Sequence, residues 1–397
     1  MNKKILITAI VIIIITAVLI VIFNKQISKL IFNPTETKLP SGIKYSDVND
    51  IRLKDTEDDS TMSAIEVVAE NLEIPWEIIF LPDDTMLVTE RPGRLLRIYP
   101  NRREGINISG VEHRGEGGLL GAALHPDFEK NNLLYLYLTS KNSDGLINRV
   151  ERYHFDAENN NLSDKKIIIN NIPGASYHDG GRIAFGSDNK LYVTTGDAGD
   201  SKLAQNINSL AGKILRLNDD GSVPGDNPFD NEIWTYGHRN PQGLAWDKDN
   251  NLWSTEHGPS GVGSGFDEIN LIQKGKNYGW PVIQGGEIQE NMQTPIIQSG
   301  ADDTWAPAGM TIVDNKLFFT GLRGEALYSA IITDDKKLYT LQTNFREDFG
   351  RLRVVRTGPD GWLYIATSNR DGRGSIRPQD DKIIKINPNL FGTHQNN

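Results

Sequence analysis

A strand–turn–strand pattern recurs six times along this chain, and this repetition limits the possible folds more than any other feature. Each copy has an apolar strand, a turn rich in Asp, Asn and Gly, a second strand that opens on leucine, and a polar or glycine-rich loop. The six leucines lie 46 to 65 residues apart: Leu87, Leu134, Leu191, Leu252, Leu317 and Leu363. Strands bounded by turn residues indicate antiparallel β structure, and repeats of this length are typical of propeller blades. The sequence therefore predicts an all-β fold, a six-bladed β-propeller.

The propeller is expected to cover residues 64–390 as one closed ring. The strand near "SAIEVVAE" would pair with the strand "DKIIKINP" close to the C-terminus. This pairing leaves no sheet edge open, which is how propellers avoid edge-to-edge association. The alternative is an open array of β-sandwich domains, but nothing divides the repeats into units of about 100 residues.

The ends of the chain differ from the repeats. Residues 5–23 carry no charge and are apolar apart from threonines. As a helix this run would be roughly 28 Å long, close to the thickness of the bilayer hydrocarbon. No small-residue cleavage pattern follows it, so residues 1–23 are expected to be an uncleaved signal anchor or transmembrane helix rather than a cleaved signal peptide. Residues 24–63 would be a polar tether and residues 391–397 a disordered tail. The protein is thus expected to be extracytoplasmic, anchored in the membrane, or secreted if the first segment is cleaved.

The composition excludes several classes of function. The formal net charge is −10 and the lysines and arginines form no block, which argues against a nucleic-acid partner. The chain has no cysteine, so disulfides and thiolate chemistry are excluded.

The repeat predicts where the loops of each blade lie. The Asp/Asn/Gly hairpin joins the two inner strands at one face of the disc. The loop before the first strand and the loop after the second strand must then both lie on the opposite face. Preceding a first strand are Glu116, His178, Arg239, Asn240, Trp305, Arg351 and Arg353, and following a second strand are Gly258, Pro259 and Arg323. These ten residues are expected to share one rim.

The residue types on this rim indicate a chemistry. A neutral histidine such as His178 is the usual general base near neutral pH. Several arginines that converge without matching acids indicate an anionic ligand with carboxylate or phosphate groups. Trp305 would offer a flat stacking surface. Together these residues favour a flat ligand with several negative charges, bound on the propeller axis.

Ordered motifs connect this reading to a known family. They include "GEGGLLGAALHPDF", "HDGGRIAFG", "YGHRNPQGLAWD", "DEINLIQKGKNYGWP" and "GRLRVVRTGPDG". With these motifs the chain resembles the soluble sugar dehydrogenases that depend on pyrroloquinoline quinone (PQQ), both the glucose and the aldose branch, from about residue 72 to 387. The resemblance implies a six-bladed propeller with PQQ on one face, an aldose substrate oxidised at C1 to the lactone, and an external electron acceptor.

The resemblance also implies roles for individual residues. His178 matches the base that removes the C1 hydroxyl proton while hydride passes to the quinone, and Arg239 would stabilise the developing charge. The matched or neighbouring cofactor contacts are Glu116, Asn240, Trp305, Arg323, Arg351 and Arg353. The carbonyls of Gly258 and Pro259 match a loop that holds Ca²⁺ at the quinone, and Glu268 and the Tyr278 backbone match a second, structural Ca²⁺ site.

The chain also departs from the glucose branch. Glu116 stands where that branch has a glutamine, and Tyr177 where it has an aspartate. Arg323 lies near the position of that branch's cofactor lysine, and the loop "GPSGVGSGFDE" is longer than expected. These differences favour the aldose branch. Asp179 lies beside the matched histidine but outside the matched position, so no role is assigned to it.

Two other functions are compatible with such a propeller. One is a Ca²⁺-dependent lactonase or esterase, which needs a central calcium bound by several acidic and amide side chains. The crowding of arginines on the rim argues against that site, because arginine repels a metal ion. The other is a propeller without enzymatic activity that binds a glycan or a protein.

Overall fold

The computed structural model describes residues 64–260 and 264–392. The expected anchor and tether, residues 1–63, lie outside the described residues. Among the residues that are described, no helix is both long and apolar enough to cross a membrane.

The described chain forms six antiparallel sheets of four strands each. The first blade contains β2 (Pro75–Phe80), β3 (Met86–Glu90), β4 (Arg94–Ile98) and β5 (Arg103–Asn107). The second contains β6 (Leu119–Leu124), β7 (Leu133–Asn142), β8 (Gly145–Asp156) and β9 (Asn161–Pro173). The third contains β10 (Ile183–Phe185), β11 (Leu191–Thr195), β12 (Lys213–Leu217) and β13 (Ile233–Tyr236).

The other three blades repeat this order. The fourth contains β14 (Pro241–Trp246), β15 (Leu252–Glu256), β16 (Glu268–Ile272) and β17 (Ile297–Gln298). The fifth contains β18 (Pro307–Val313), β19 (Lys316–Gly321), β20 (Ala326–Ile332) and β21 (Leu338–Asn344). The sixth contains β22 (Leu352–Thr357), β23 (Leu363–Thr367), β24 (Ile383–Ile386) and β1 (Ile65–Ala69). Short helical turns are α3 (Phe128–Asn131), α4 (Lys202–Gln205) and η2 (Pro388–Phe391).

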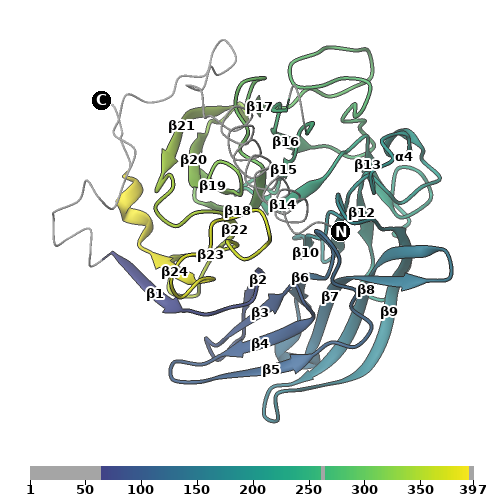
Figure 1. The fold of residues 1–397 in the computed structure, drawn as a ribbon. Helices are drawn as coiled ribbons and strands as arrows, with labels where there is room; N and C mark the ends of the chain where they lie inside the picture. The colour runs from purple at the N-terminus through teal and green to yellow at the C-terminus, as the bar shows by residue number, and fades with distance from the viewer. Residues whose placement is uncertain (1–63, 261–263, 393–397) are drawn as a thin grey trace, which may run out of the picture.

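The six sheets stand around a common centre, with the first strand of each blade innermost (Figure 1). The ring is closed by β1, which pairs antiparallel with β24 and completes the last blade with a strand from the other end of the domain. The prediction of a six-bladed propeller closed by these two segments is therefore confirmed.

The hairpins between the two inner strands of each blade share one backbone feature. Each has a residue with positive φ at its tip: Asp84, Asn132, Asn189, Asn250, Asp314 and Gly361. Gly, Asn and Asp tolerate this left-handed conformation best, since most side chains clash there. The Asp, Asn and Gly residues that mark the repeat in the sequence are thus the ones that the turns require.

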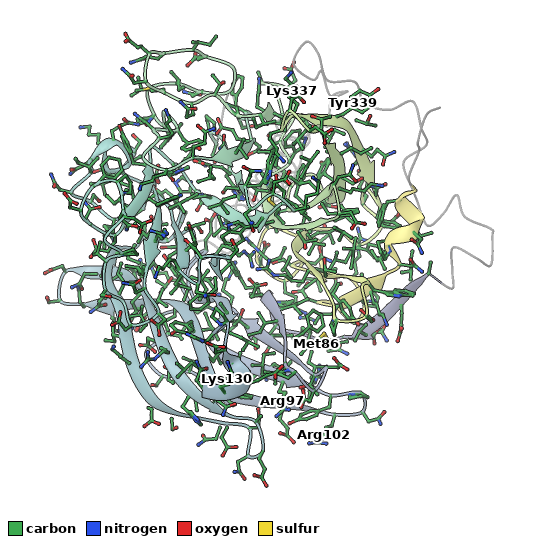
Figure 2. The ribbon with its side chains drawn as sticks, turned by 180° about the vertical axis from the view of Figure 1, so that it is seen from behind. Met86, Arg97, Arg102, Lys130, Lys337 and Tyr339 are labelled. Carbon is green, nitrogen blue, oxygen red and sulfur yellow. The ribbon has the colours of Figure 1, made fainter. Side chains whose placement is uncertain are left out.

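The core lies between neighbouring blades rather than in one central cluster. The second strand of most blades is buried along its whole length, because side chains on both faces of the sheet pack against adjacent blades. In Figure 2 side chains fill the disc, whereas labelled Tyr339 lies at the periphery with 63% of its surface exposed. The C-terminal boundary extends past residue 390, because Phe391 is buried against Phe318 and Phe345. Phe391 therefore corrects the predicted start of the tail, and residues 393–397 lie outside the described residues.

Closure by β1 can be tested by truncation. A chain that begins at residue 70 lacks β1, whereas a chain that begins at residue 64 retains it. We expect the shorter chain to melt at least about 5 °C lower, because β24 becomes an open edge and several kcal/mol of packing are lost. Calorimetry with light scattering checks this. Equal melting temperatures and equal aggregation of the two chains would show that β1 is dispensable.

Candidate active site

Loops from several blades meet around the imidazole of His178. This residue precedes β10 and has a left-handed backbone with φ of 60°. Its Nδ1 lies 2.7 Å from Oδ1 of Asp197, which follows β11. Asp197 also accepts hydrogen bonds from the Gly199 backbone at 2.8 Å and from Nε1 of Trp280 at 2.9 Å. Burial opposes the ionisation of Asp197, but these hydrogen bonds outweigh it and lower its pKa. An ionised Asp197 holds the His178 proton on Nδ1 and leaves Nε2 as the basic nitrogen.

Asp197 was missed by the sequence analysis, although a signal for it existed. It lies in "TTGDAGD", directly after the second strand of the third repeat. The rule that places such loops on the histidine face therefore covers it. The backbone N–H of Asp197 donates to the Arg239 carbonyl at 2.8 Å, so the loops of two blades are joined beside the histidine.

Glu116 lies against the backbone of the histidine. Its Oε2 accepts the His178 N–H at 3.0 Å, and its Oε1 accepts from Nη1 of Arg373 at 2.6 Å. Burial acts against ionisation here too, but Arg373 and the His178 N–H lower the pKa of Glu116 to about 2. Glu116 is therefore an ionised group whose two oxygens each have a donor.

Arg239 and Asn240 lie next to the histidine, as the sequence predicts. Arg239 donates through Nη2 to Oγ of Ser260 at 2.9 Å, and its guanidinium lies 5.4 Å from the centre of the Trp280 ring. Asn240 accepts the Gly180 N–H at 3.0 Å, whereas its own buried Nδ2 has no partner in the part of the chain that the structure describes. An amide nitrogen buried without an acceptor is costly, so Nδ2 is a ready donor to a ligand.

Arg351 and Arg353 also converge on this site. Arg351 forms two hydrogen bonds with Oδ2 of Asp371, through Nε at 3.0 Å and Nη2 at 2.7 Å. Arg353 donates through Nη1 to Oε1 of Gln242, and within residues 64–260 and 264–392 its buried Nε has no partner. Burial lowers the pKa of Arg353 to about 9, Asp371 opposes this, and the charges of Arg91 and Arg351 lower it further. These guanidinium groups are thus crowded together.

Arg91 and His257 were missed by the sequence analysis. Arg91 follows β3, the second strand of the first blade, and its Nη2 lies 3.4 Å from the Asp371 carbonyl. His257 follows β15, and its buried Nε2 has no hydrogen-bond partner among the described residues. Burial lowers the pKa of His257 to about 3, Glu116 acts against this, and the charge of Arg353 adds to it, so the ring is neutral. Like Asp197, both residues lie in a loop that follows the second strand of a blade.

Two predicted rim residues, Arg323 and Trp305, differ in their surroundings: Arg323 is half-buried near other charged groups, whereas Trp305 is fully buried. Burial is the main cause that lowers the pKa of half-buried Arg323, and the charges of Asp267 and Arg351 also act on it, which places Arg323 beside the arginine group. The prediction that Trp305 presents a stacking surface is wrong. Its ring is fully buried between the fourth and fifth blades, 5.4 Å from the Phe319 ring and 5.7 Å from the Tyr328 ring. Apolar packing with these rings is what turns the indole inward.

The sequence of this chain is similar to those of known proteins. Residues 72–377 match the family described as Glucose / Sorbosone dehydrogenase. The chain belongs to this family. It is 33% identical over 358 residues to the aldose sugar dehydrogenase YliI of Escherichia coli K12, a match that covers 82% of this chain and 92% of that protein. The family resemblance predicted from the motifs is therefore confirmed.

Solved structures of sugar dehydrogenases are also similar. An oxidoreductase described as a glucose dehydrogenase from Thermus thermophilus is 42% identical, with a TM-score of 0.77, over 81% of this chain and 99% of that one. The PQQ-bound form of the aldose sugar dehydrogenase from Streptomyces coelicolor is 36% identical, with a TM-score of 0.75, over 81% of this chain and 97% of that one.

In this member of the glucose/sorbosone dehydrogenase family, the four residues predicted as metal ligands line one small cavity. Gly258, Pro259, Glu268 and Tyr278 line it together with other residues that include Glu256, Arg239 and His257, and its volume is about 10 Å³. Burial raises the pKa of Glu268 to about 8, and the neighbouring Glu256 raises it as well. Within the described part of the chain, no three His, Asp or Glu side chains converge as a metal-ligand set. Any metal here would therefore need backbone carbonyls in addition to the carboxylates.

Asp179 does not contact the imidazole of His178. Its Oδ1 accepts from Nδ2 of Asn148 at 2.9 Å and from the Ala175 N–H at 3.1 Å, while none of the described residues donates to its buried Oδ2. Burial raises the pKa of Asp179 to about 7, and the nearby charge of Glu116 adds to this. Asp179 is thus a buried acid that resists ionisation within the loop that carries the histidine.

The substitution Asp179→Asn tests this environment. We expect the free energy of unfolding of the unsubstituted protein, relative to Asp179→Asn, to fall between about pH 4 and pH 7, because the folded state retains a proton that the unfolded chain releases near pH 4. The slope would be at most about 1.4 kcal/mol per pH unit, and the difference would be constant above about pH 7. Urea denaturation across this range measures it.

Asp156→Asn serves as the control, because hydrogen bonds from Asn159 lower the pKa of exposed Asp156. That substitution cannot produce a fall over the same range. Parallel stability profiles for the unsubstituted protein and Asp179→Asn would contradict the assignment of a protonated Asp179.

Proposed function

We propose that this oxidoreductase converts aldose sugars to lactones at C1, with PQQ as its cofactor. The observation that carries the proposal is the pairing of His178 with Asp197 beside a group of crowded arginines. The pair supplies a base with a defined basic nitrogen, and the arginines supply a binding site for an anionic cofactor. PQQ, when bound, would accept the C1 hydrogen with its electron pair.

His178 would take the proton of the C1 hydroxyl at Nε2. The C1–H bond breaks with its electron pair leaving, and the C1–O bond becomes the carbonyl of the lactone. The imidazolium formed in this step is stabilised by the ionised Asp197 at Nδ1, as in other histidine–carboxylate pairs. Trp280 donates to the other oxygen of Asp197 and so fixes the direction of the carboxylate.

The cofactor fits the donors that the structure leaves without partners. A ligand with several carboxylates would satisfy the buried Nε of Arg353 and offset the mutual repulsion of Arg91, Arg351 and Arg353. The buried Nδ2 of Asn240 and Nε2 of His257 supply two further polar contacts for ring oxygen or nitrogen atoms. Arginine suits this task because its planar fork matches carboxylate geometry.

Calcium is part of the proposal. The carbonyls of Gly258 and Pro259, with Glu256, Glu268 and the Tyr278 backbone, are hard oxygen groups of the kind that bind Ca²⁺. The cavity they line accommodates one ion-sized occupant. Bound Ca²⁺ would release the proton that burial and Glu256 keep on Glu268, because a ligating carboxylate must be deprotonated.

The proposed calcium site predicts a change in thermal stability. We expect Ca²⁺ at about 100 times its dissociation constant to stabilise the protein by about 2.7 kcal/mol, which is a rise of several degrees in melting temperature. Glu268→Gln should abolish most of this rise, because the amide retains the shape but not the charge. Calorimetry with Ca²⁺, and with Mg²⁺ as the control cation, measures the effect. An equal rise in Glu268→Gln, or no rise in the unsubstituted protein, would overturn the site.

We further propose that residues 1–23 anchor the enzyme to a membrane, with the propeller on the extracytoplasmic side, and that an external acceptor reoxidises the cofactor. The apolar run at the N-terminus supports the anchor. The lactone product requires an acceptor, because two electrons leave the sugar in each turnover.

A reconstitution experiment tests the reaction. Purified protein with PQQ and Ca²⁺ should reduce a redox dye when aldoses are added. His178→Gln should lower kcat by about 10²- to 10⁴-fold while PQQ still binds, because only proton removal is lost. Hydrolysis of lactones without PQQ would instead indicate the lactonase, and the absence of both activities would indicate a binding propeller.

A further inference from the structure

An arginine from the sixth blade reaches across to the loop that carries the histidine base. Arg373 lies between β23 and β24, whereas Glu116 precedes β6 and His178 precedes β10. Nη1 of Arg373 lies 2.6 Å from Oε1 of Glu116, and Oε2 of Glu116 accepts the His178 N–H at 3.0 Å. Three loops that are far apart in the sequence are thus joined through one carboxylate.

The backbone of His178 needs such a contact. Histidine tolerates a left-handed conformation less well than glycine, asparagine or aspartate do, so contacts with its surroundings help to hold it. Glu116 holds the N–H side, and the Ala198 N–H binds the His178 carbonyl at 3.2 Å on the other side. Arg373 keeps Glu116 ionised and directed toward the N–H, and so acts on the base without touching it.

The Arg373 loop is itself tied to the arginine group of the proposed cofactor site. Asp371 accepts the backbone N–H of Arg373 at 2.9 Å through Oδ1 and binds Arg351 through Oδ2. Asp371 is nearly fully buried, with 3% of its side chain exposed, so this anchor is rigid. The contacts therefore run without a break from Arg351 to the backbone of the base.

We propose that Arg373 is a positioning residue for the reaction, which acts through Glu116 to hold His178 and links that position to the arginines of the cofactor site. This proposal rests on the proposed dehydrogenase function. It also gives Glu116 a different role from the predicted contact with the cofactor, since both of its oxygens are already used within the protein. The side chain of Arg373 is 60% exposed, so the folded state depends little on it.

The decisive variant is Arg373→Met in the full chain loaded with PQQ and Ca²⁺. We expect kcat to fall roughly tenfold, because general-base catalysis depends on the placement of the base, while KM for the sugar changes less than about twofold. PQQ affinity and melting temperature should stay close to those of the unsubstituted protein. Arg373→Lys should recover most of kcat, because an ammonium can still bind Glu116.

Two further variants make the result specific. Arg377 lies in the same loop, and its guanidinium donates to the carbonyls of Asp348 and Glu347 rather than to Glu116, so Arg377→Met is the matched control and should leave kcat unchanged. Arg373→Met should add little to the effect of Glu116→Ala, because both substitutions remove the same linkage.

A measurement without cofactor separates this proposal from the proposed function. In protein labelled with ¹⁵N-histidine, the backbone amide resonance of His178, identified by its loss in His178→Gln, should shift in Arg373→Met and stay in place in Arg377→Met. If the unsubstituted enzyme oxidises no aldose, the proposed function fails, and this resonance still tests the linkage. An unmoved resonance, or an active enzyme whose kcat is insensitive to Arg373→Met, would overturn the positioning role.

Discussion

Closure of the ring by β1 is the constraint on which the rest of this structure depends. Pairing of β1 with β24 joins the two ends of the domain and fixes six inner strands around one axis. Each blade then delivers two loops to the same face, and most residues of the proposed active site lie in such a loop or at the start of an inner strand, while Trp280 comes from the segment between β16 and β17. The site is therefore a consequence of closure, because no single blade contains enough of its groups.

The site brings several buried arginines close together, an arrangement that is electrostatically unfavourable in the absence of a ligand. Burial and the charges of neighbouring arginines lower the pKa of Arg353 to about 9 and also lower that of Arg91, whereas burial is what lowers the pKa of Arg239. Asp371 opposes the lowered pKa values of Arg91 and Arg353, and Asp197 opposes that of Arg239. Bringing these guanidinium groups together costs free energy in the folded state. An anionic ligand offsets part of this cost when it binds. This imbalance is what distinguishes the site from a central calcium cage of carboxylates.

Much of this organisation could be predicted from the sequence, and the failures have physical causes. The repeated turns determine the blades and the face on which each loop lies, which was enough to bring His178, Arg239 and Arg353 together. Trp305 was placed on the correct loop, but the direction of its side chain depends on apolar partners from other strands. Asp197 was overlooked because it is distant from the histidine in sequence, and its contact with His178 crosses from one loop to another.

The two aspartates near the base show why contacts decide roles more than residue type. Asp197 has three donors and stays ionised despite burial, so it can stabilise a cation on His178. Asp179 is one residue from the histidine, yet one of its oxygens has no donor and burial raises its pKa to about 7. Asp197 therefore contributes a negative charge beside His178. Asp179 instead stabilises the shape of the loop through its hydrogen bonds. Glu116 is kept ionised by Arg373, which is distant in sequence, and it binds the backbone N–H of His178.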